Sequence, residues 1–438
     1  MAAFTRRGAV AVALGALLLT GCASAATDSG GVKPTTDVAN PYQAERKAQM
    51  QPVLDQWAQA LRDGDEEALR ALTDPAAAPD FIQRQMRAAG GISKLDFTRW
   101  DFTIGDDPEV FVPQGIADRV GGLDVAAPPV YLNFQLAGVD EKPVSTPVGV
   151  IMARRGDTWT LVSDNETADS THATWPAGPW VFGPTESLKV PSGTSGDAGL
   201  VLFHPGSESA AGLVAAMLPD AVTAISDFWG TDWDRSVVVE IAASDEEFSA
   251  LTGNEMGRTD VAAASISLRK DGEQDGHGQR IVFSPSAFDR LDELQRTIVL
   301  RHELTHLAVR RDTGRGAPAW LVEGMPDYVA YRGLGVPLRD AVPQVAAMVA
   351  ANGPPDSLPE DIAFAGTMAD LAYQLGRTVS DFVVATMGED KLKELHRALA
   401  IGGLAEGPLD AAVMQVTGMN MNQFTTAWSQ WLGAQFGA

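Results

Sequence analysis

The sequence predicts an α+β protein with two folded units, and three observations support this prediction. The chain has 438 residues, more than one hydrophobic core ordinarily serves. Apolar residues at helical spacing near residues 50–61 are followed by alternating apolar and polar residues, which is typical of antiparallel strands. Further on, strand-like segments give way at residue 287 to sequence that is helical to the end. We therefore expect helices with an antiparallel sheet, and then a small mixed sheet followed by a mostly helical part.

Composition excludes several classes of function. The chain is 45% hydrophobic and 21% charged, as in globular proteins. Its net charge of −24 repels nucleic acid and anionic headgroups, so we expect no nucleic-acid partner. There is one cysteine, so we expect no disulfides and no thiol catalysis in the mature protein.

The first residues are typical of an export signal. Residues 1–21 combine Arg6 and Arg7 with an apolar run that is too short to span a bilayer. The following "LTGC" resembles a bacterial lipobox, which implies cleavage before Cys22 and a diacylglycerol on its thiol. The alternative is a secretory peptide with an incidental cysteine. We expect residues 22–42 to be a flexible tether, and the protein to be lipid-anchored on the extracytoplasmic face of a bacterial cell membrane.

Residues 43–185 form the first predicted unit. A helix with an apolar stripe ends at Gly64, and Asp65 begins the next one. Strands are predicted at 94–104, 130–136, 148–154 and 159–163, the last two forming a hairpin. This order is similar to SnoaL-like, nuclear-transport-factor-like domains, which implies a cone of helices and a curved antiparallel sheet. We expect a spacer or a ligand-binding module, with His172 on the surface.

Residues 186–438 form the second predicted unit. Pro- and Gly-rich stretches at 175–187 and 190–199 mark the boundary before it. The pattern predicts a helix over 211–228, a capping box at 244–248, and helices after residue 287. The strands that we expect are at 200–204, 236–242, 261–268 and 280–284.

The stretch "HELTH" at 302–306 is the chain's chemical signature. It lies in a predicted helix over 291–311, where His302 and His306 stand one turn apart on the same face. Two imidazoles at this spacing can bind one zinc ion, with Glu303 beside it as a general base. The alternative is two partly buried histidines on an amphipathic helix.

A catalytic zinc ion needs a third protein ligand, and two carboxylates are candidates. Asp312 lies six residues after His306, but the sharp turn that would bring it back needs a glycine where the chain has Val309. Its more ordinary role is that of a helix-end residue. Glu323 lies in "APAWLVEGMPDYVAY", on a second helix that can return alongside the first. We therefore favour Glu323.

"HELTH" followed by "WLVEGMPDY" resembles the gluzincin metallopeptidases and, within them, the peptidase MA-like domains of exported bacterial proteins. The resemblance implies one catalytic Zn²⁺ ion held by His302, His306 and Glu323. It also implies that Glu303 is the general base and that Asp327 orients a ligand histidine.

The sequence departs from this family at Pro326, where a small residue is usual. If the second helix starts near Trp320, Pro326 falls past its first turn and kinks it. This casts doubt on the contact of Asp327 and, to a lesser degree, on that of Glu323.

Gluzincins often use a tyrosine or histidine to stabilise the oxyanion of the tetrahedral intermediate. Tyr328, Tyr331, Tyr373 and His396 are available, and core packing is the alternative for each. We prefer Tyr373, because similar domains carry a tyrosine-containing helix at that place.

The expected function is that of a membrane-anchored, zinc-dependent metallopeptidase that hydrolyses a peptide or protein substrate. The alternative is a non-catalytic lipoprotein that keeps the scaffold as a surface binding module.

Overall fold

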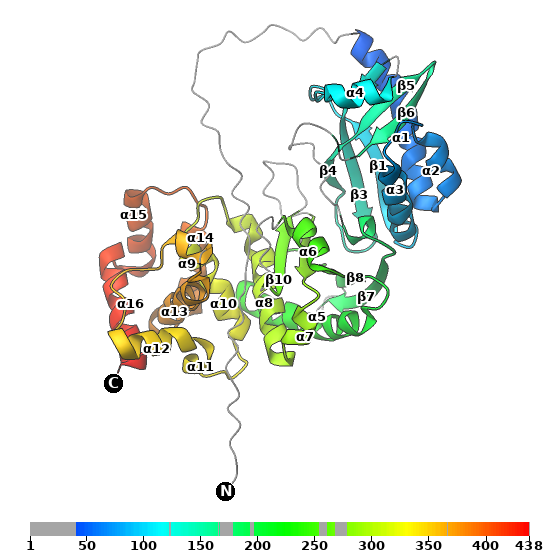
Figure 1. Cartoon of the computed structure of the whole chain (residues 1–438). Helices are drawn as coiled ribbons and strands as arrows, with labels where there is room; N and C mark the ends of the chain where they lie inside the picture. The colour runs from blue at the N-terminus through cyan, green and yellow to red at the C-terminus, as the bar shows by residue number, and fades with distance from the viewer. Residues whose placement is uncertain are drawn as a thin grey trace, which may run out of the picture.

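The computed structural model describes residues 41–121, 124–164, 166, 178–192, 197–253, 261–267, 278–365 and 367–437. Figure 1 shows an N-terminal unit of helices and strands, a sheet beside it, and a helical C-terminal part on the far side of that sheet. The α+β fold class is thus as predicted. The signal segment, Cys22, the tether to residue 40 and His172 lie outside the described residues.

The N-terminal unit contains two three-stranded antiparallel sheets, ordered β1-β3-β4 and β2-β5-β6. The predicted helix start at Asp65 is confirmed, since its side chain accepts the N–H of Ala68. The elements of this unit are α1 (Pro41–Asp63), α2 (Glu66–Leu72), α3 (Pro79–Ile92), β1 (Phe97–Ile104), α4 (Gln114–Val120), β2 (Asp124–Ala126), β3 (Pro129–Leu136), β4 (Val144–Gly149), β5 (Ile151–Arg155) and β6 (Thr158–Ser163).

The prediction of one strand over 148–154 is wrong. The chain leaves β4 at Gly149 and enters β5 at Ile151, and these strands belong to different sheets. The β5–β6 register shifts between Ile151 and Met152, which is the signature of a bulge at a corner. Because residues on both sides of this corner are buried, the apolar pattern continues through it without a break.

Aromatic side chains fill the interior of the N-terminal unit. The 3-10 helix η2 (Pro179–Val181) brings Trp180 into contact with rings from the β1-β3-β4 sheet. Its ring centroid lies 5.3 Å from that of Phe97, 5.9 Å from Trp100 and 5.4 Å from Phe134, at steep interplanar angles. Trp180 is fully buried. A segment predicted as a boundary loop therefore supplies a central core residue.

The second unit begins with a five-stranded mixed sheet, ordered β10-β11-β9-β8-β7. Strands β8–β9 and β9–β11 are parallel, and the other pairs are antiparallel. The bounds are β7 (Glu186–Ser192), β8 (Asp197–Phe203), β9 (Val238–Ile241), β10 (Ala263–Ser267) and β11 (Gln279–Phe283).

The predicted break over 190–199 is wrong in part, because it includes the end of β7 and the start of β8. Pro191 pairs with Ala198 there. Since β7 is an edge strand, the N–H that Pro191 lacks is missing from a position where the sheet tolerates it.

Helices complete the second unit, as predicted from residue 287 onward. The long helix α5 packs against α8, and α10 packs against α8 and α13. The helices are α5 (Glu208–Trp229), α6 (Asp245–Thr252), α7 (Ala287–Arg290), α8 (Glu293–Val309), α9 (Ala319–Val322), α10 (Gly324–Tyr331), α11 (Leu338–Ala341), α12 (Pro343–Asn352), α13 (Ala369–Met387), α14 (Glu389–Leu399), α15 (Glu406–Thr417) and α16 (Met421–Phe436), with the 3-10 turns η3 (Arg310–Asp312) and η4 (Asp361–Ala365).

Among the described helices, α5 alone is long and apolar enough to cross a bilayer, judged by length and composition. In this fold one face of α5 is buried in the core of the second unit, through residues such as Leu218, Ile225 and Phe228.

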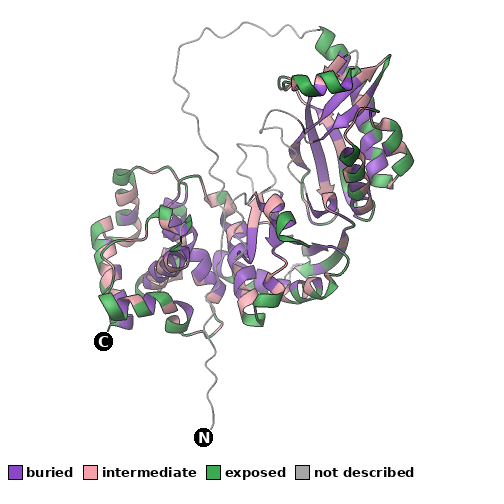
Figure 2. Cartoon of the chain, viewed as in Figure 1, coloured by how far each residue is buried: buried purple, intermediate pink, exposed green. Residues whose placement is uncertain are grey.

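The two faces of the mixed sheet contact different cores. Val201 and Val239 point into the core of the second unit, where α5 and α8 pack. Their neighbours Leu200, Leu202 and Val238 belong to the core of the N-terminal unit instead. Figure 2 shows buried residues running through the sheet between the two units. Each face of the sheet is thus covered by a different part of the chain.

Candidate metal centre

Helix α8 supplies three of the candidate site residues. Its start is fixed by a capping box, in which Asp292 accepts the N–H of Gln295 and the Gln295 side chain accepts the N–H of Asp292. With no glycine or proline up to Val309, the helix continues past His302, Glu303 and His306. His302 and Glu303 are fully buried, and the His306 side chain is 17% exposed.

The fourth residue, Glu323, lies where two short helices join. Helix α9 ends at Val322 and α10 begins at Gly324, so Glu323 is the junction, and Pro326 falls in the first turn of α10. The expectation that Pro326 would kink a helix past its first turn is therefore wrong. A first-turn N–H has no partner within its own helix, so proline is tolerated there.

The junction keeps Glu323 and Asp327 on one turn, because the N–H of Asp327 donates to the carbonyl of Glu323 at 3.1 Å. Asp327 Oδ1 lies 3.0 Å from His302 Nδ1, so the predicted contact between these residues is present in the structure. This contact leaves His302 Nε2 facing the other candidate ligands.

Three ligand atoms converge between α8 and the α9–α10 junction. His302 Nε2 lies 3.0 Å from His306 Nε2, and Glu323 Oε2 lies 3.5 Å from each of them. A tetrahedral ion with bonds of about 2.0–2.2 Å holds its ligand atoms about 3.3–3.6 Å apart. Both distances to Glu323 fall within this range, and the distance between the two histidine nitrogens is about 0.3 Å shorter than its lower end. Glu323 Oε2 is buried and accepts no hydrogen bond. The donor set, its spacing and this orphaned oxygen fit Zn²⁺.

In the described part of the chain, these three residues are the one group of histidine, cysteine or acidic side chains with the spacing of a metal site. Asp312 is not part of it. Its side chain is 42% exposed in η3, 3.9 Å from Arg397, which is the helix-end position that the sequence also allowed.

The charges of the cluster shift the pKa of its members in opposite directions. Burial lowers the pKa of His302, but its hydrogen bond to Asp327 and the nearby carboxylates of Glu323 and Glu303 raise it to about 10. Burial raises the pKa of Glu323, but the histidines outweigh burial and lower it to about 2. Both shifts have the same cause, the attraction between the positive histidines and the negative carboxylates, which favours the charged form of each.

Glu303 differs from the other carboxylates of the site. It is fully buried, and neither of its oxygens has a hydrogen-bond partner. Burial raises its pKa, and the charges of His302 and His306 only partly oppose that rise. A carboxylate in this state is suited to taking up a proton, which is what general-base catalysis needs.

Two glycines bring α10 and α13 into backbone contact. A Cβ on Gly324 would lie 2.2 Å from the carbonyl oxygen of Gly376, so only glycine fits there. Gly324 directly follows Glu323, and Gly376 follows Tyr373 by three residues on α13. The contact thus sets the distance between the elements that carry these side chains. Sequence reasoning missed this pair, although "EG" and "DLAYQLG" both place a glycine beside a candidate residue.

The four candidates for oxyanion stabilisation lie in different places. Tyr373 is buried, with its ring centroid 6.4 Å from that of His302. The hydroxyl of Tyr328 donates to Glu389, and the ring of Tyr331 lies under the guanidinium of Arg377 at 3.8 Å. His396 is fully buried beside Trp229, at 5.4 Å between centroids. Of the four, Tyr373 is the one in ring contact with a member of the cluster.

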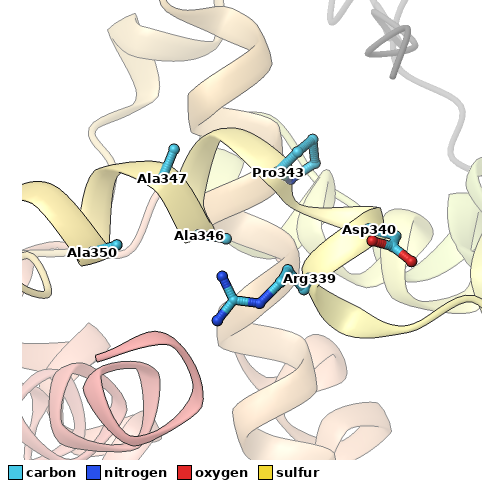
Figure 3. A pocket seen from close by; sticks show the side chains of 6 residues that line it. All are labelled: Arg339, Asp340, Pro343, Ala346, Ala347 and Ala350. Atoms are coloured by element: carbon cyan, nitrogen blue, oxygen red, sulfur yellow. The ribbon is translucent and has the colours of Figure 1, made fainter. Parts of the chain in front are cut away.

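A pocket of about 410 Å³ lies apart from this cluster, on α11 and α12 (Figure 3). Three of its six lining residues are alanine, and none of the six is a candidate site residue. It is lined by Arg339, Asp340, Pro343, Ala346, Ala347 and Ala350.

No family model matches the chain, and no curated protein matches it. Among solved structures, an M1 zinc metallopeptidase from Deinococcus radiodurans is similar at 15% identity and a TM-score of 0.33, covering 64% of this chain and 58% of that one. A mutant of an M1 zinc metallopeptidase from the same organism, bound to a Tyr-Ser-Ala substrate, is similar at 15% identity and a TM-score of 0.33. The match covers 70% of this chain and 60% of that one. A two-domain M1 zinc metallopeptidase mutant bound to L-arginine is similar at 14% identity and a TM-score of 0.34. The match covers 66% of this chain and 59% of that one. The chain thus spans about three-fifths of the length of these structures, and at these TM-scores we draw no conclusion from the likeness.

Proposed function

We propose that the protein is a gluzincin-type zinc metallopeptidase that hydrolyses peptide bonds. One observation supports this most strongly, namely that His302 Nε2, His306 Nε2 and Glu323 Oε2 converge to within 3.5 Å of one another. Glu303 lies on the same helix, one residue from His302, with an unpartnered buried carboxylate. Three ligands and an adjacent base are what metal-assisted hydrolysis needs.

In this proposal each side chain has a separate task. A zinc ion held by His302, His306 and Glu323 would supply Lewis-acid activation of a water molecule and of the scissile carbonyl. Glu303 accepts a proton from that water on a carboxylate oxygen and donates it to the leaving amine. Asp327 accepts the Nδ1 hydrogen of His302 and so holds the ring with Nε2 toward the ion. The hydroxyl of Tyr373 donates to the oxyanion.

We further propose that the protein acts on the extracytoplasmic face of a bacterial membrane, anchored through a lipid on Cys22. The support is the order of basic residues, short apolar run and "LTGC" in residues 1–22. In the N-terminal unit, the helices and antiparallel strands support the proposed SnoaL-like cone. Trp180 fills its interior, so we propose a spacer and not a ligand-binding module.

Zinc content and peptide hydrolysis, measured on three variants, test the metallopeptidase proposal. We expect one zinc per wild-type chain, loss of zinc in His306→Ala, and full zinc but no hydrolysis in Glu303→Gln. Glu293→Gln is the matched control, because Glu293 lies in the first turn of the same helix and away from the cluster. This variant should keep both zinc and activity.

The outcomes separate the enzyme from the alternative function. Stoichiometric zinc without hydrolysis of a broad peptide library would favour the non-catalytic binding module. Absence of zinc from the wild-type protein, purified without chelators and supplied with Zn²⁺, would refute the metal site itself.

A further inference from the structure

The N-terminal unit meets the mixed sheet through buried charged side chains, which we name the seam. Asp140 comes from the turn after β3, Glu240 from β9 and Arg280 from β11. Their side chains are 5%, 1% and 2% exposed, respectively. Charged groups are almost never buried to this degree unless they are paired. Which carboxylate of the seam pairs with Arg280 therefore determines which carboxylate keeps its proton.

Arg280 forms its close ion pair with Asp140. Its Nη2 donates to Asp140 at 2.9 Å, across the join between the two units, and its Nη1 donates to the carbonyl of Gln279. Glu240 is left with a weaker contact, since its Oε1 lies 3.9 Å from Arg280 Nε. Neither oxygen of Glu240 has a hydrogen-bond partner, and both are buried.

The second cation near the seam, His204, is paired with a carboxylate other than Glu240. His204 lies at the end of β8, with Nδ1 2.8 Å from the carbonyl oxygen of Pro184 and Nε2 2.8 Å from Glu247 Oε1. Burial lowers the pKa of His204, but these two acceptors outweigh burial and raise it, which favours a positively charged ring that donates from both nitrogens. The other oxygen of Glu247 accepts the N–H of Ala243. His204 and Glu247 thus satisfy each other.

Three carboxylates therefore share two cations. Arg280, Glu247 and Asp140 are the charged groups that face Glu240 among the described residues, and two of them are negative. An ionised carboxylate without a partner is costly in a buried site, so the acid retains its proton there. In agreement, burial raises the pKa of Glu240 to about 8, with Arg280 opposing the rise and Glu247 and Asp140 adding to it.

We propose that Glu240 holds a proton in the folded protein, and that losing this proton at alkaline pH loosens the N-terminal unit from the sheet. The unfolded chain binds this proton less tightly than the folded one. The stabilisation is therefore fully present below the ordinary pKa of glutamate and is lost as pH rises through about 8. Strand β11, which carries Arg280, pairs with β10, and β10 packs on the site helix α8. The seam lies one strand away from the strand that packs on helix α8, which carries His302 and His306.

Glu240→Gln tests the proposal, because glutamine copies the shape of the protonated acid and cannot ionise. The matched control is Glu246→Gln, an exposed position on α6. We expect the infrared difference between the wild-type protein and Glu240→Gln at pH 6.5 to contain the C=O band of a protonated carboxylic acid. This band should disappear above pH 8. Between pH 5 and 8, the unfolding constant of the wild type should rise by about tenfold per pH unit relative to Glu240→Gln.

Scattering and a second variant complete the test. The radius of gyration should increase above pH 8 in the wild type and in Glu246→Gln, and stay constant in Glu240→Gln. In Asp140→Asn, Arg280 is free to pair with Glu240, so the infrared band should be lost at a lower pH. Absence of the band from the wild type at pH 6.5 would overturn the proposal. The proposal would also be overturned if the radius of gyration and the unfolding constant depended on pH in the same way in the wild type and in Glu240→Gln.

Discussion

Gly324→Ala should distort the candidate metal centre without touching a ligand. The added Cβ would lie 2.2 Å from the carbonyl oxygen of Gly376, 2.4 Å from its carbonyl carbon and 3.0 Å from the backbone nitrogen of Arg377. All three are backbone atoms, so no side chain can move aside. Restoring ordinary contact requires α10 and α13 to separate by about 1 Å in a close-packed interior.

The size of the effect follows from the neighbours of Gly324. Overpacking of this kind costs about 1–3 kcal/mol of stability. Glu323 and Asp327 flank the glycine, so both move relative to the histidines of α8. Displacing Glu323, the proposed ligand, and Asp327, the residue proposed to orient His302, should weaken zinc binding by about 10-fold to 100-fold. Gly376→Ala should act in the same direction but less strongly, because its Cβ would lie 3.0 Å from the nearest atom, the carbonyl oxygen of Trp320.

Urea unfolding and zinc competition against a chromophoric chelator measure the two effects. Gly212→Ala is the matched control, since it lies within helix α5 and its Cβ would meet nothing within 4 Å. That variant should bind zinc as the wild type does and gain up to about 1 kcal/mol in stability. If Gly324→Ala keeps both its zinc affinity and its stability, the backbone contact does not position Glu323 and the reasoning fails.

Three further predictions address other parts of the molecule. Trp180→Ala should cost about 3–5 kcal/mol in urea unfolding, because it leaves a cavity among the aromatic rings of the N-terminal unit; an unchanged midpoint would contradict this role. Burial raises the pKa of Asp74, but hydrogen bonds from Arg155 and Thr160 outweigh burial and lower the pKa. The stabilisation that the ionised Asp74 contributes is therefore present above pH 3.8 and is lost as pH falls through the folded-state pKa. Asp74→Asn should therefore cost about 1–3 kcal/mol at pH 7 and little in strong acid, and a cost independent of pH would refute the assignment. Tyr373→Phe should lower kcat by about 10²-fold to 10³-fold with zinc content unchanged, and a wild-type kcat would exclude it from oxyanion stabilisation.

Local sequence predicted the parts of the site that depend on one helix. His302, Glu303 and His306 could be placed because α8 has a capped start and no breaker, and the spacing of four residues fixes a shared face. Glu323 could be favoured because its helix can return alongside the first one, whereas its role as a ligand and the role of Asp327 came from the family resemblance. The structure brings all five residues together.

The rest depended on contacts between segments that are distant in sequence. The effect of Pro326 was misjudged because the end of α9 at Val322 is set by packing against α13, which contains Gly376. Trp180 lies in a proline- and glycine-rich stretch that by composition belongs to a loop, yet its ring contacts Phe134 and Phe97, which lie 46 and 83 residues earlier on strands of the sheet. Neither contact leaves a periodic pattern in the sequence.

The unpartnered carboxylate of Glu303 has a consequence for how this sequence can evolve. A buried ionisable group without a hydrogen bond lowers stability by about 1–3 kcal/mol. Many apolar or amide replacements would remove that penalty while leaving the surrounding helix packing intact. A lineage selected for folding or for surface binding alone would therefore drift away from glutamate at this position. Under the proposed function, an acid retained here reflects selection for proton transfer at the expense of stability, and drift at position 303 would mark descendants that have lost peptide hydrolysis.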